Sequence, residues 1–353
     1  MRGDDDAQPL RRDRVGDLVD TATLEALLGP LLSLERSPLA TIGYTASHHE
    51  LLTATLADGT SRRLVLKRVE VGRDWTAVRS GDRRGREAAL LLEPTLAGVW
   101  KAFDSPYHAV AVEGGEIGLL MRDLTPHLFP DVREPLRAEE EQAVVDALAA
   151  LHARFWASPA VALPWLAPAR TYAGLLDAPS ARDPEALAAL TPMLRDLVPR
   201  GWEAALAAAP AAVRDLLTCP AEDLEPHWRD LPATLVHGDV KVANFALLPS
   251  GRVAAFDWAL VGAAPAAVDV GWYLAVNATR LAHTKETFLD RYRSALRAAR
   301  GADLDAATWA ALSRAAVVFG ARMLLWTKAL ALAAGGERAQ REWSWWMERL
   351  AAV

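Results

Sequence analysis

The sequence predicts an α+β protein of two lobes, a small antiparallel sheet followed by a larger, mainly helical part. Residues 38–122 hold short runs rich in Thr, Val and Leu, separated by turn signals such as Asp58-Gly59, which are typical of strands joined in hairpins. From about residue 137 the apolar residues recur at steps of three and four, the period of an amphipathic helix. Strands followed by helices favour an α+β architecture with a cleft between the lobes.

Three parts follow from this pattern. Residues 1–37 are expected to form a solvated arm and a helix over 21–36. The sheet lobe, 38–122, is expected to contain strands near 39–45, 49–56 and 62–70, a helix near 83–93, and strands near 107–113 and 117–122. The helical lobe, 123–353, is expected to contain a helix from about 137 and long helices near 265–280, 284–299, 305–332 and 337–351, with a strand-like interruption at 233–257.

The composition is that of an ordinary globular protein. The 353 residues are 52% hydrophobic, and the net charge of −6 is spread evenly, which excludes the electrostatic footprint of a nucleic-acid-binding protein. One cysteine, Cys219, allows no internal disulfide and indicates a cytoplasmic protein. The charged N-terminal segment lacks the apolar core of a signal peptide. Arg322 and Lys328 interrupt the apolar stretch 315–332, so we expect no membrane partner, and no protein partner is evident.

The segment HGDVKVANF at 237–245 carries the first chemical signal. Asp239 is followed five residues later by Asn244. A loop of this length can aim the carboxylate at a hydroxyl while the amide oxygen faces a metal ion, the arrangement used in phosphoryl transfer. A polar turn after a strand uses the same residue types, so the segment alone leaves both interpretations open.

A second carboxylate, Asp257, lies thirteen residues beyond Asn244, after an apolar strand-like run. A hairpin that turns at residues 249–251 would return Asp257 to the neighbourhood of Asn244. A carboxylate and an amide oxygen are suitable ligands for Mg²⁺. Asp257 is therefore a candidate metal ligand because Asn244 would lie close to it. Its local sequence alone would not indicate a metal site.

Lysine is rare in this chain, with five lysines among 39 basic residues. Lys67 lies in RRLVLKRVE, where strand alternation places it on one face together with Val65. Glu87 lies on the apolar face of the expected helix 83–93, where a carboxylate needs a partner, and Lys67 is the candidate. Taken alone, Lys67 would be interpreted as an exposed lysine of an edge strand.

The segment GYTAS at 43–47 falls between two expected strands. Backbone N–H groups beginning at Gly43 and the hydroxyl of Thr45 or Ser47 are candidates for contacts with phosphate. An ordinary hairpin turn explains the segment equally well.

These elements, in this order, resemble the aminoglycoside phosphotransferase and choline kinase-like family, a branch of the protein-kinase-like fold. HGDVKVANF is similar to the family's catalytic loop, FDW at 256–258 to its metal-binding element, and GAAPAAVDVGWYLA at 262–275 to the segment that follows. ALAALHARFW at 147–156 is especially similar to a helix of the ecdysteroid-kinase-like bacterial members. The resemblance runs from about residue 38 to 280 and is strongest at 234–275.

The resemblance implies transfer of a phosphoryl group from ATP to a hydroxyl of a small molecule, with ATP and Mg²⁺ as cofactors. Asp239 would orient, and deprotonate, the acceptor hydroxyl. Asn244 and Asp257 would hold Mg²⁺. Lys67 would contact the α- and β-phosphates and pair with Glu87.

Further roles are implied for residues outside this group. Asp269 would brace the catalytic loop, and His237 would fix it structurally. Met121 and Asp123 lie in LMRDL, which resembles the interlobe hinge whose backbone reads adenine. Lys241 would meet the γ-phosphate, although a solvated loop lysine explains it as well. The helical lobe would then contain the catalytic loop and the acceptor site.

Other protein classes fit less well. A protein kinase would have HRD rather than HGD, and the dozen residues between Asp257 and Asp269 leave no room for a long activation loop. A nucleotide-binding pseudokinase or scaffold would be expected to lose a key residue, yet Lys67, Asp239, Asn244 and Asp257 are all present. A metal-dependent hydrolase would need more converging ligands.

The acceptor stays open between an antibiotic, an amino alcohol, a sugar and a steroid-like molecule, because acceptor choice depends on variable helices. The tryptophans at 343, 345 and 346 suggest an aromatic cage for a cation. Packing of a helix against the lobe is the interpretation we favour, since all three side chains cannot share one helix face.

Overall fold

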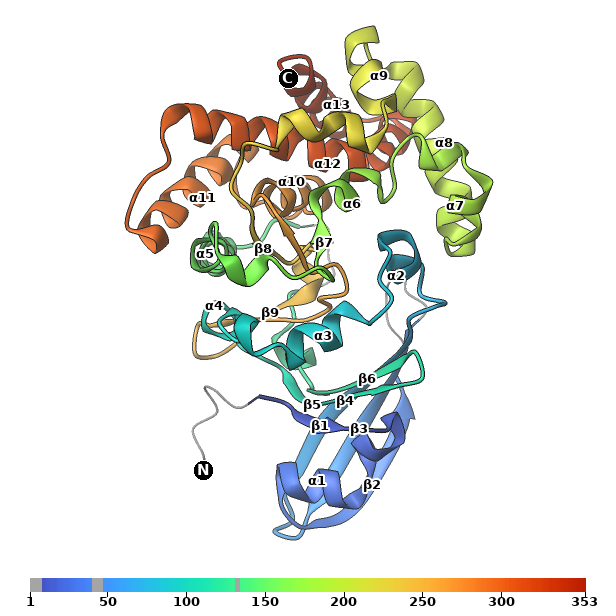
Figure 1. Cartoon of the computed structure of the whole chain (residues 1–353), viewed down its shortest axis with the longest axis vertical. Helices are drawn as coiled ribbons and strands as arrows, with labels where there is room; N and C mark the ends of the chain where they lie inside the picture. The colour runs from blue at the N-terminus through green and yellow to red at the C-terminus, as the bar shows by residue number, and fades with distance from the viewer. Residues whose placement is uncertain (1–7, 40–46, 131–133) are drawn as a thin grey trace.

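The computed structural model describes residues 8–39, 47–130 and 134–353. A six-stranded sheet forms one lobe and most of the helices form the other, at the lower and upper ends of Figure 1. The strands are β1 (Leu10–Arg12), β2 (Leu31–Pro38), β3 (His48–Leu56), β4 (Ser61–Glu70), β5 (Tyr107–Glu113) and β6 (Glu116–Arg122), in the order β1-β5-β6-β4-β3-β2. Only the β1–β5 pair in this sheet is parallel. The predicted α+β architecture, a sheet lobe followed by a mainly helical lobe, is confirmed.

Strand β4 shows how the sheet buries both of its faces. Leu64 and Leu66 join an apolar cluster with Leu24 of helix α1 (Thr21–Leu28). Val65 points to the opposite face and joins the main core, which continues into the helical lobe. Lys67 has the same parity as Val65 in the strand, so its side chain reaches toward the helical lobe.

Three short helices lie between the sheet and the helical lobe in Figure 1: α2 (Trp75–Ser80), α3 (Arg86–Leu92) and α4 (Val99–Ala102). The helical lobe itself contains α5 (Ala138–Arg154), α6 (Ala169–Gly174), α7 (Pro184–Ala188), α8 (Pro192–Ala208), α9 (Ala211–Thr218), α10 (Ala267–Val276), α11 (Lys285–Arg300), α12 (Ala306–Ala334) and α13 (Glu337–Leu350). In α13, Trp343 and Trp346 are buried against the lobe, which confirms packing rather than a cage.

Two small sheets complete the helical lobe. Strands β9 (Phe245–Leu247) and β10 (Val253–Ala255) pair in an antiparallel hairpin. Strands β7 (Ala167–Pro168), β8 (Thr234–Val236) and β11 (Gly262–Ala264) form a sheet in the order β7-β11-β8. The loops that carry the predicted chemistry leave the ends of these strands.

Helices α10 and α12 form the centre of the helical lobe. They meet at two glycines: a Cβ at Gly271 would collide with the carbonyl oxygen of Ala316, and one at Gly320 would collide with that of Gly271. Helix α12 is long and apolar enough to cross a membrane, but it is mostly buried in this core. The close packing fixes the position of α10, and Asp269 and Trp272 of this helix contact the loop at residues 237–245.

The structure differs from the sequence prediction near the N-terminus. The helix expected over 21–36 ends at Leu28, because Gly29 takes a φ of 98° and Pro30 follows it. Residues 31–38 form strand β2 instead. Residue 39 lies just beyond this strand, and the rest of the strand expected at 39–45 lies outside the described residues. The other four strands expected in this lobe match β3, β4, β5 and β6 to within one residue at each end. Strand β2 crosses residue 37, where we divided the arm from the sheet lobe, and the domain division stays a prediction.

Candidate active site

The HGDVKVANF segment forms the loop between β8 and β9. Gly238 has a φ of 82°, and a Cβ there would collide with the carbonyl oxygen of Leu260, so this position requires glycine. The Asp269 carboxylate accepts hydrogen bonds from the N–H groups of His237 and Gly238, both at 2.8 Å. Because Asp269 lies in the first turn of α10, this helix fixes the start of the loop.

The end of α10 fixes the same loop at a second point. Asn277 Oδ1 accepts a hydrogen bond from the N–H of Val242 at 3.0 Å, and Asn277 Nδ2 donates to the carbonyl oxygen of Val240 at 2.9 Å. Asn277 is buried. The sequence analysis missed this residue, and the only signal was a polar side chain directly after an apolar helix.

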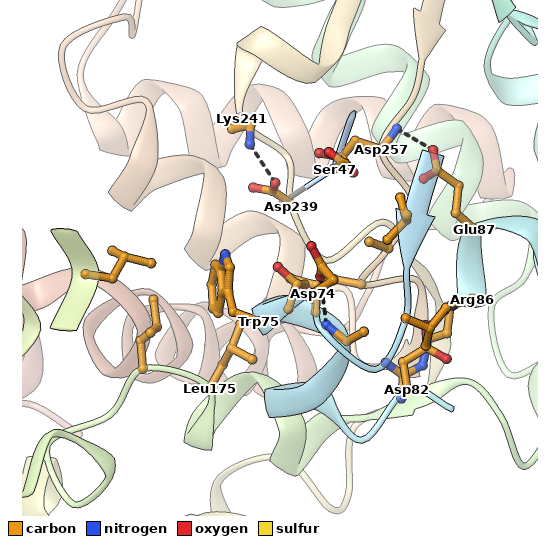
Figure 2. A pocket seen from close by; sticks show the side chains of 18 of the residues that line it. Ser47, Asp74, Trp75, Asp82, Arg86, Glu87, Leu175, Asp239, Lys241 and Asp257 are labelled. Atoms are coloured by element: carbon orange, nitrogen blue, oxygen red, sulfur yellow. Dashed lines mark hydrogen bonds and ion pairs between the residues drawn. The ribbon is translucent and has the colours of Figure 1, made fainter. Parts of the chain in front are cut away.

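Three donors hold the Asp239 carboxylate, and Figure 2 shows one of them, Lys241. Trp272 Nε1 donates to Oδ1 at 2.8 Å, and Asn244 Nδ2 donates to Oδ2 at 3.0 Å. Lys241 Nζ lies 3.0 Å from Oδ2. The carboxylate is therefore fixed in orientation, and Trp272 is a contributor that the sequence analysis did not identify.

Asp257 reaches the same neighbourhood through the predicted hairpin. Asn244 precedes β9 and Asp257 follows β10, and the N–H of Phe256 donates to the carbonyl oxygen of Asn244 at 3.2 Å. Asp257 has a φ of 64°, a left-handed conformation that costs energy for a residue with a side chain. Such strain is retained where the surrounding contacts determine the geometry, which is frequent at functional sites.

Lys67 connects the sheet lobe to the helical lobe. Its Nζ lies 2.7 Å from Glu87 Oε2 and 2.7 Å from Asp257 Oδ1. Glu87 Oε1 accepts from the hydroxyl of Tyr107 at 2.6 Å and from the N–H of Asp257 at 3.0 Å. The structure therefore pairs Lys67 with Glu87, as the sequence predicts. Tyr107 was missed, because a tyrosine in an apolar strand is ordinarily a core residue.

The charges of this cluster stabilise one another. Burial opposes the charged form of Lys67, but attraction to Asp257 and Glu87 holds the pKa of Lys67 above its usual range. Burial likewise opposes the charged form of Asp257, yet Lys67 and Lys241 hold the pKa of Asp257 well below its usual range. Lys241 behaves like Lys67: burial opposes its charge, and Asp239 and Asp257 raise the pKa of Lys241. All three groups are consequently ionised at neutral pH.

His237 has a structural role. Burial lowers the pKa of His237, which favours the neutral ring. The N–H of Asp239 donates to Nδ1 at 3.3 Å, so the proton resides on Nε2, which donates to the carbonyl oxygen of Phe256 at 3.1 Å. The ring thus ties the catalytic loop to the segment that carries Asp257.

A cavity of about 470 Å³ opens beside these residues. Lys67, Asp239, Lys241 and Asp257 line one end of it, together with Ser47, and Figure 2 shows Asp239, Lys241 and Asp257 gathered there. The remainder of the lining is largely apolar. The cavity therefore joins an end that carries the candidate catalytic groups to a mainly apolar part, which also contains Asp74, Asp82 and Arg86.

Met121 and Asp123, two of the residues predicted to bind the nucleotide, are not among the described residues that line this cavity. Gly43 lies outside the described residues. Met121 and Asp123 lie at the end of β6, where the chain passes from the sheet to the helical lobe, and Asp123 pairs with Arg63 at 2.9 Å. Their contact with adenine stays a prediction.

Comparison with known proteins identifies the family. The model of a phosphotransferase enzyme family matches residues 50–312. The choline kinase LicA from Streptococcus pneumoniae shares 14% identity over 94% of this chain and 98% of its own, with a TM-score of 0.46. The macrolide 2'-phosphotransferase MphH from Brachybacterium faecium shares 15% identity over 95% and 97% of the two chains, with a TM-score of 0.44. A choline/ethanolamine kinase family protein from Mesorhizobium loti shares 16% over 96% and 94%, with a TM-score of 0.42.

None of the curated proteins compared with the chain matches it. The family match spans most of the sequence and includes Lys67, Glu87, Asp239, Asn244 and Asp257. The family predicted from the order of these residues is confirmed: the chain belongs to the phosphotransferase enzyme family and is a small-molecule kinase.

Proposed function

We propose that this kinase transfers the γ-phosphoryl group of ATP to a hydroxyl of a small molecule, with Mg²⁺ as the metal. The observation that carries the proposal is the gathering of Lys67, Asp239, Asn244 and Asp257 from three separate segments beside one cavity. Phosphoryl transfer requires a cation on the phosphates, a divalent metal and a group that orients the nucleophile. Each of these parts has a residue in the cluster.

Lys67 is the candidate phosphate ligand. Its ammonium group is held between Glu87 and Asp257 and faces the cavity. Ser47, which lines the same end, and the segment beginning at Gly43 would contact the phosphates. The backbone around Met121 and Asp123 would then bind adenine where the two lobes join.

Asn244 and Asp257 fit a hard divalent cation. The amide nitrogen of Asn244 faces Asp239, which leaves the carbonyl oxygen as the atom for a metal. The Asp257 side chain remains 25% exposed while one oxygen binds Lys67. Oxygen ligands of this kind suit Mg²⁺, so Asn244 and Asp257 would hold the ion, and its charge would offset the negative charge of the phosphates.

Asp239 would orient the acceptor hydroxyl. In the proposed step the acceptor oxygen bonds to the γ-phosphorus, the bond from that phosphorus to the β–γ bridging oxygen breaks, and ADP leaves. The hydroxyl proton passes to the Asp239 carboxylate, which Trp272 and Asn244 hold in place. Lys241, beside Asp239, would meet the γ-phosphate once nucleotide is bound.

The proposal is tested by acceptor-dependent release of ADP from the full chain, with ATP and GTP compared and with EDTA as the metal-free control. We expect release that requires Mg²⁺ and an alcohol, and an Asp257→Asn variant that is at least 100-fold slower. Turnover that persists in EDTA, or an Asp257→Asn variant as active as the parent, would contradict it. We also expect a cytoplasmic location, where ATP is available.

A further inference from the structure

The cavity beside Asp239 continues into an apolar region that the proposed chemistry does not use. Its walls come from both lobes and include Trp75 of α2, Leu175, Leu194 of α8, Val276 of α10, and Leu324 and Trp326 of α12. In the view of Figure 2 the Trp75 indole stands between Leu175 and Asp239. An acceptor whose hydroxyl reaches Asp239 must therefore lie against these apolar side chains.

The charged groups of this region are already engaged by the protein. Asp82 accepts hydrogen bonds from the N–H groups of Arg84 and Gly85 at 3.0 Å and from that of Arg86 at 2.7 Å. The Arg86 guanidinium donates to both oxygens of Ser80, at 2.6 and 2.9 Å, and to a backbone carbonyl at 2.9 Å. Both side chains are buried, and their hydrogen bonds stabilise the turn at which α3 begins.

Among the described residues that line the apolar region, Asp74 is the remaining carboxylate. It caps α2 by accepting from the N–H of Ala77 at 3.0 Å, and it is buried. Burial raises the pKa of Asp74, which weakens it as a partner for a cation. A polycationic acceptor needs several available carboxylates, since each buried charge requires its own partner.

We infer that the acceptor is an uncharged, largely apolar alcohol, bound between α2, α8 and α12 with its hydroxyl at Asp239. This inference rests on the proposed function. The cavity of about 470 Å³ contains both the charged end, where the phosphates and the metal would lie, and the apolar part that would receive the acceptor. The apolar walls would bind the acceptor because contact with them removes its hydrocarbon surface from water. Asp74, Asp82 and Arg86 would keep their hydrogen bonds within the protein.

The first test measures what the cavity binds, independently of catalysis. N-phenyl-1-naphthylamine, an uncharged apolar fluorophore, is titrated into the full chain, and its displacement by testosterone, farnesol, kanamycin and choline is followed. We expect the fluorophore to bind and the two apolar alcohols to displace it, with kanamycin and choline at least tenfold weaker. Displacement by kanamycin or choline at equal or lower concentration overturns the inference, as does failure of the fluorophore to bind.

A variant at the rim of the cavity locates the binding. Met193 of α8 lines the cavity but is 57% exposed, so Met193→Glu adds a charge to the wall with little risk to folding. Leu32 of β2 is 67% exposed and is not among the residues that line the cavity, so Leu32→Glu is the matched control. We expect Met193→Glu to weaken fluorophore binding about tenfold and Leu32→Glu to leave it within about twofold. If Met193→Glu and Leu32→Glu weaken fluorophore binding equally, the fluorophore does not bind in this cavity, and that part of the inference is overturned.

Phosphoryl transfer to the same compounds separates this inference from the proposed function. Faster transfer to testosterone or farnesol than to kanamycin or choline supports both. Efficient transfer to kanamycin or choline supports the proposed function and overturns the acceptor class. Absence of transfer to every compound, with the apolar alcohols still displacing the fluorophore, supports an apolar ligand for the cavity and counts against the proposed function.

Discussion

Lys67 and Asp257 are 190 residues apart in the sequence, and Lys67 Nζ lies 2.7 Å from Asp257 Oδ1. One residue belongs to the sheet lobe and the other follows β10 in the helical lobe. Glu87 binds the same ammonium group and also accepts from the N–H of Asp257. The ion pair therefore aligns the two lobes and places the candidate phosphate ligand beside a candidate metal ligand.

The first prediction concerns this cluster. Lys67→Met leaves the buried Glu87 and the partly buried Asp257 without their shared cation, and breaking such a pair costs about 3 kcal/mol of unfolding free energy. We also expect nucleotide affinity to fall about tenfold and transfer at least 100-fold. Urea unfolding measures the stability, and calorimetric titration measures the nucleotide affinity. Lys101 is exposed, so Lys101→Met is the control variant. Unchanged stability and affinity in Lys67→Met would contradict the role.

The second prediction concerns the brace of the catalytic loop. Asp269→Asn replaces one accepting oxygen with a donor that faces a backbone N–H, of His237 or Gly238. We expect kcat to fall by about 100-fold, because the loop that carries Asp239 loses its position. Nucleotide Kd should stay within about threefold, since Asp269 lies beneath the loop rather than in the cavity. A variant that loses nucleotide affinity while keeping kcat would refute this positioning role.

The third prediction concerns Trp272. Trp272→Phe keeps an aromatic ring but removes the N–H that holds Asp239 Oδ1. The expected loss in kcat is about three- to tenfold, the size of one hydrogen bond to a charged group that retains other donors. The measurement is kcat at saturating nucleotide and acceptor. A loss confined to the KM for acceptor would show that Trp272 acts only as part of the cavity wall.

The fourth prediction is a pH dependence of stability. Burial lowers the pKa of Lys328 to about 8, and its Nζ lies 2.6 Å from the carbonyl oxygen of Ala275 and 3.7 Å from Glu342 Oε1. An unfolded lysine titrates near pH 10.4, so between about pH 8 and 10 the unfolded chain binds more protons and Lys328 makes the unfolding free energy rise with pH.

Lys328→Met removes this contribution. The unfolding free energy of the parent relative to the variant should increase from pH 7.5 to pH 9.5, by on the order of 1–3 kcal/mol. Urea unfolding at the two pH values measures it, with each protein compared at both. A parent-to-variant difference that is the same at both pH values would mean that Lys328 does not titrate in this interval.

The sequence was informative where chemistry or a local period restricts the residue. Alternation in β4 placed Lys67 on the face opposite Leu64 and Leu66, and the structure confirms it. The hairpin that brings Asp257 back to Asn244 followed from the spacing and a turn signal. These inferences use contacts that are close in sequence or fixed by strand geometry.

Other parts of the site depend on contacts that no local pattern reveals. Trp272 and Asn277 reach the catalytic loop because α10 is held against α12, a packing that rests on two glycines distant in sequence. The apolar end of the cavity is assembled from five or more segments, each of which reads as ordinary core. The helix expected over 21–36 failed because the turn at Gly29-Pro30 outweighed the apolar spacing after it.

The most direct test of the proposed function compares Asp239→Ala with the parent chain in two measurements, acceptor-dependent ADP release and binding of ATP with Mg²⁺. Asp239 would orient the hydroxyl, whereas Lys67, Asn244 and Asp257 would hold the nucleotide and the metal. We expect transfer in Asp239→Ala to fall by about 1000-fold or more while nucleotide Kd stays within about threefold. Turnover in Asp239→Ala equal to that of the parent would contradict the assignment.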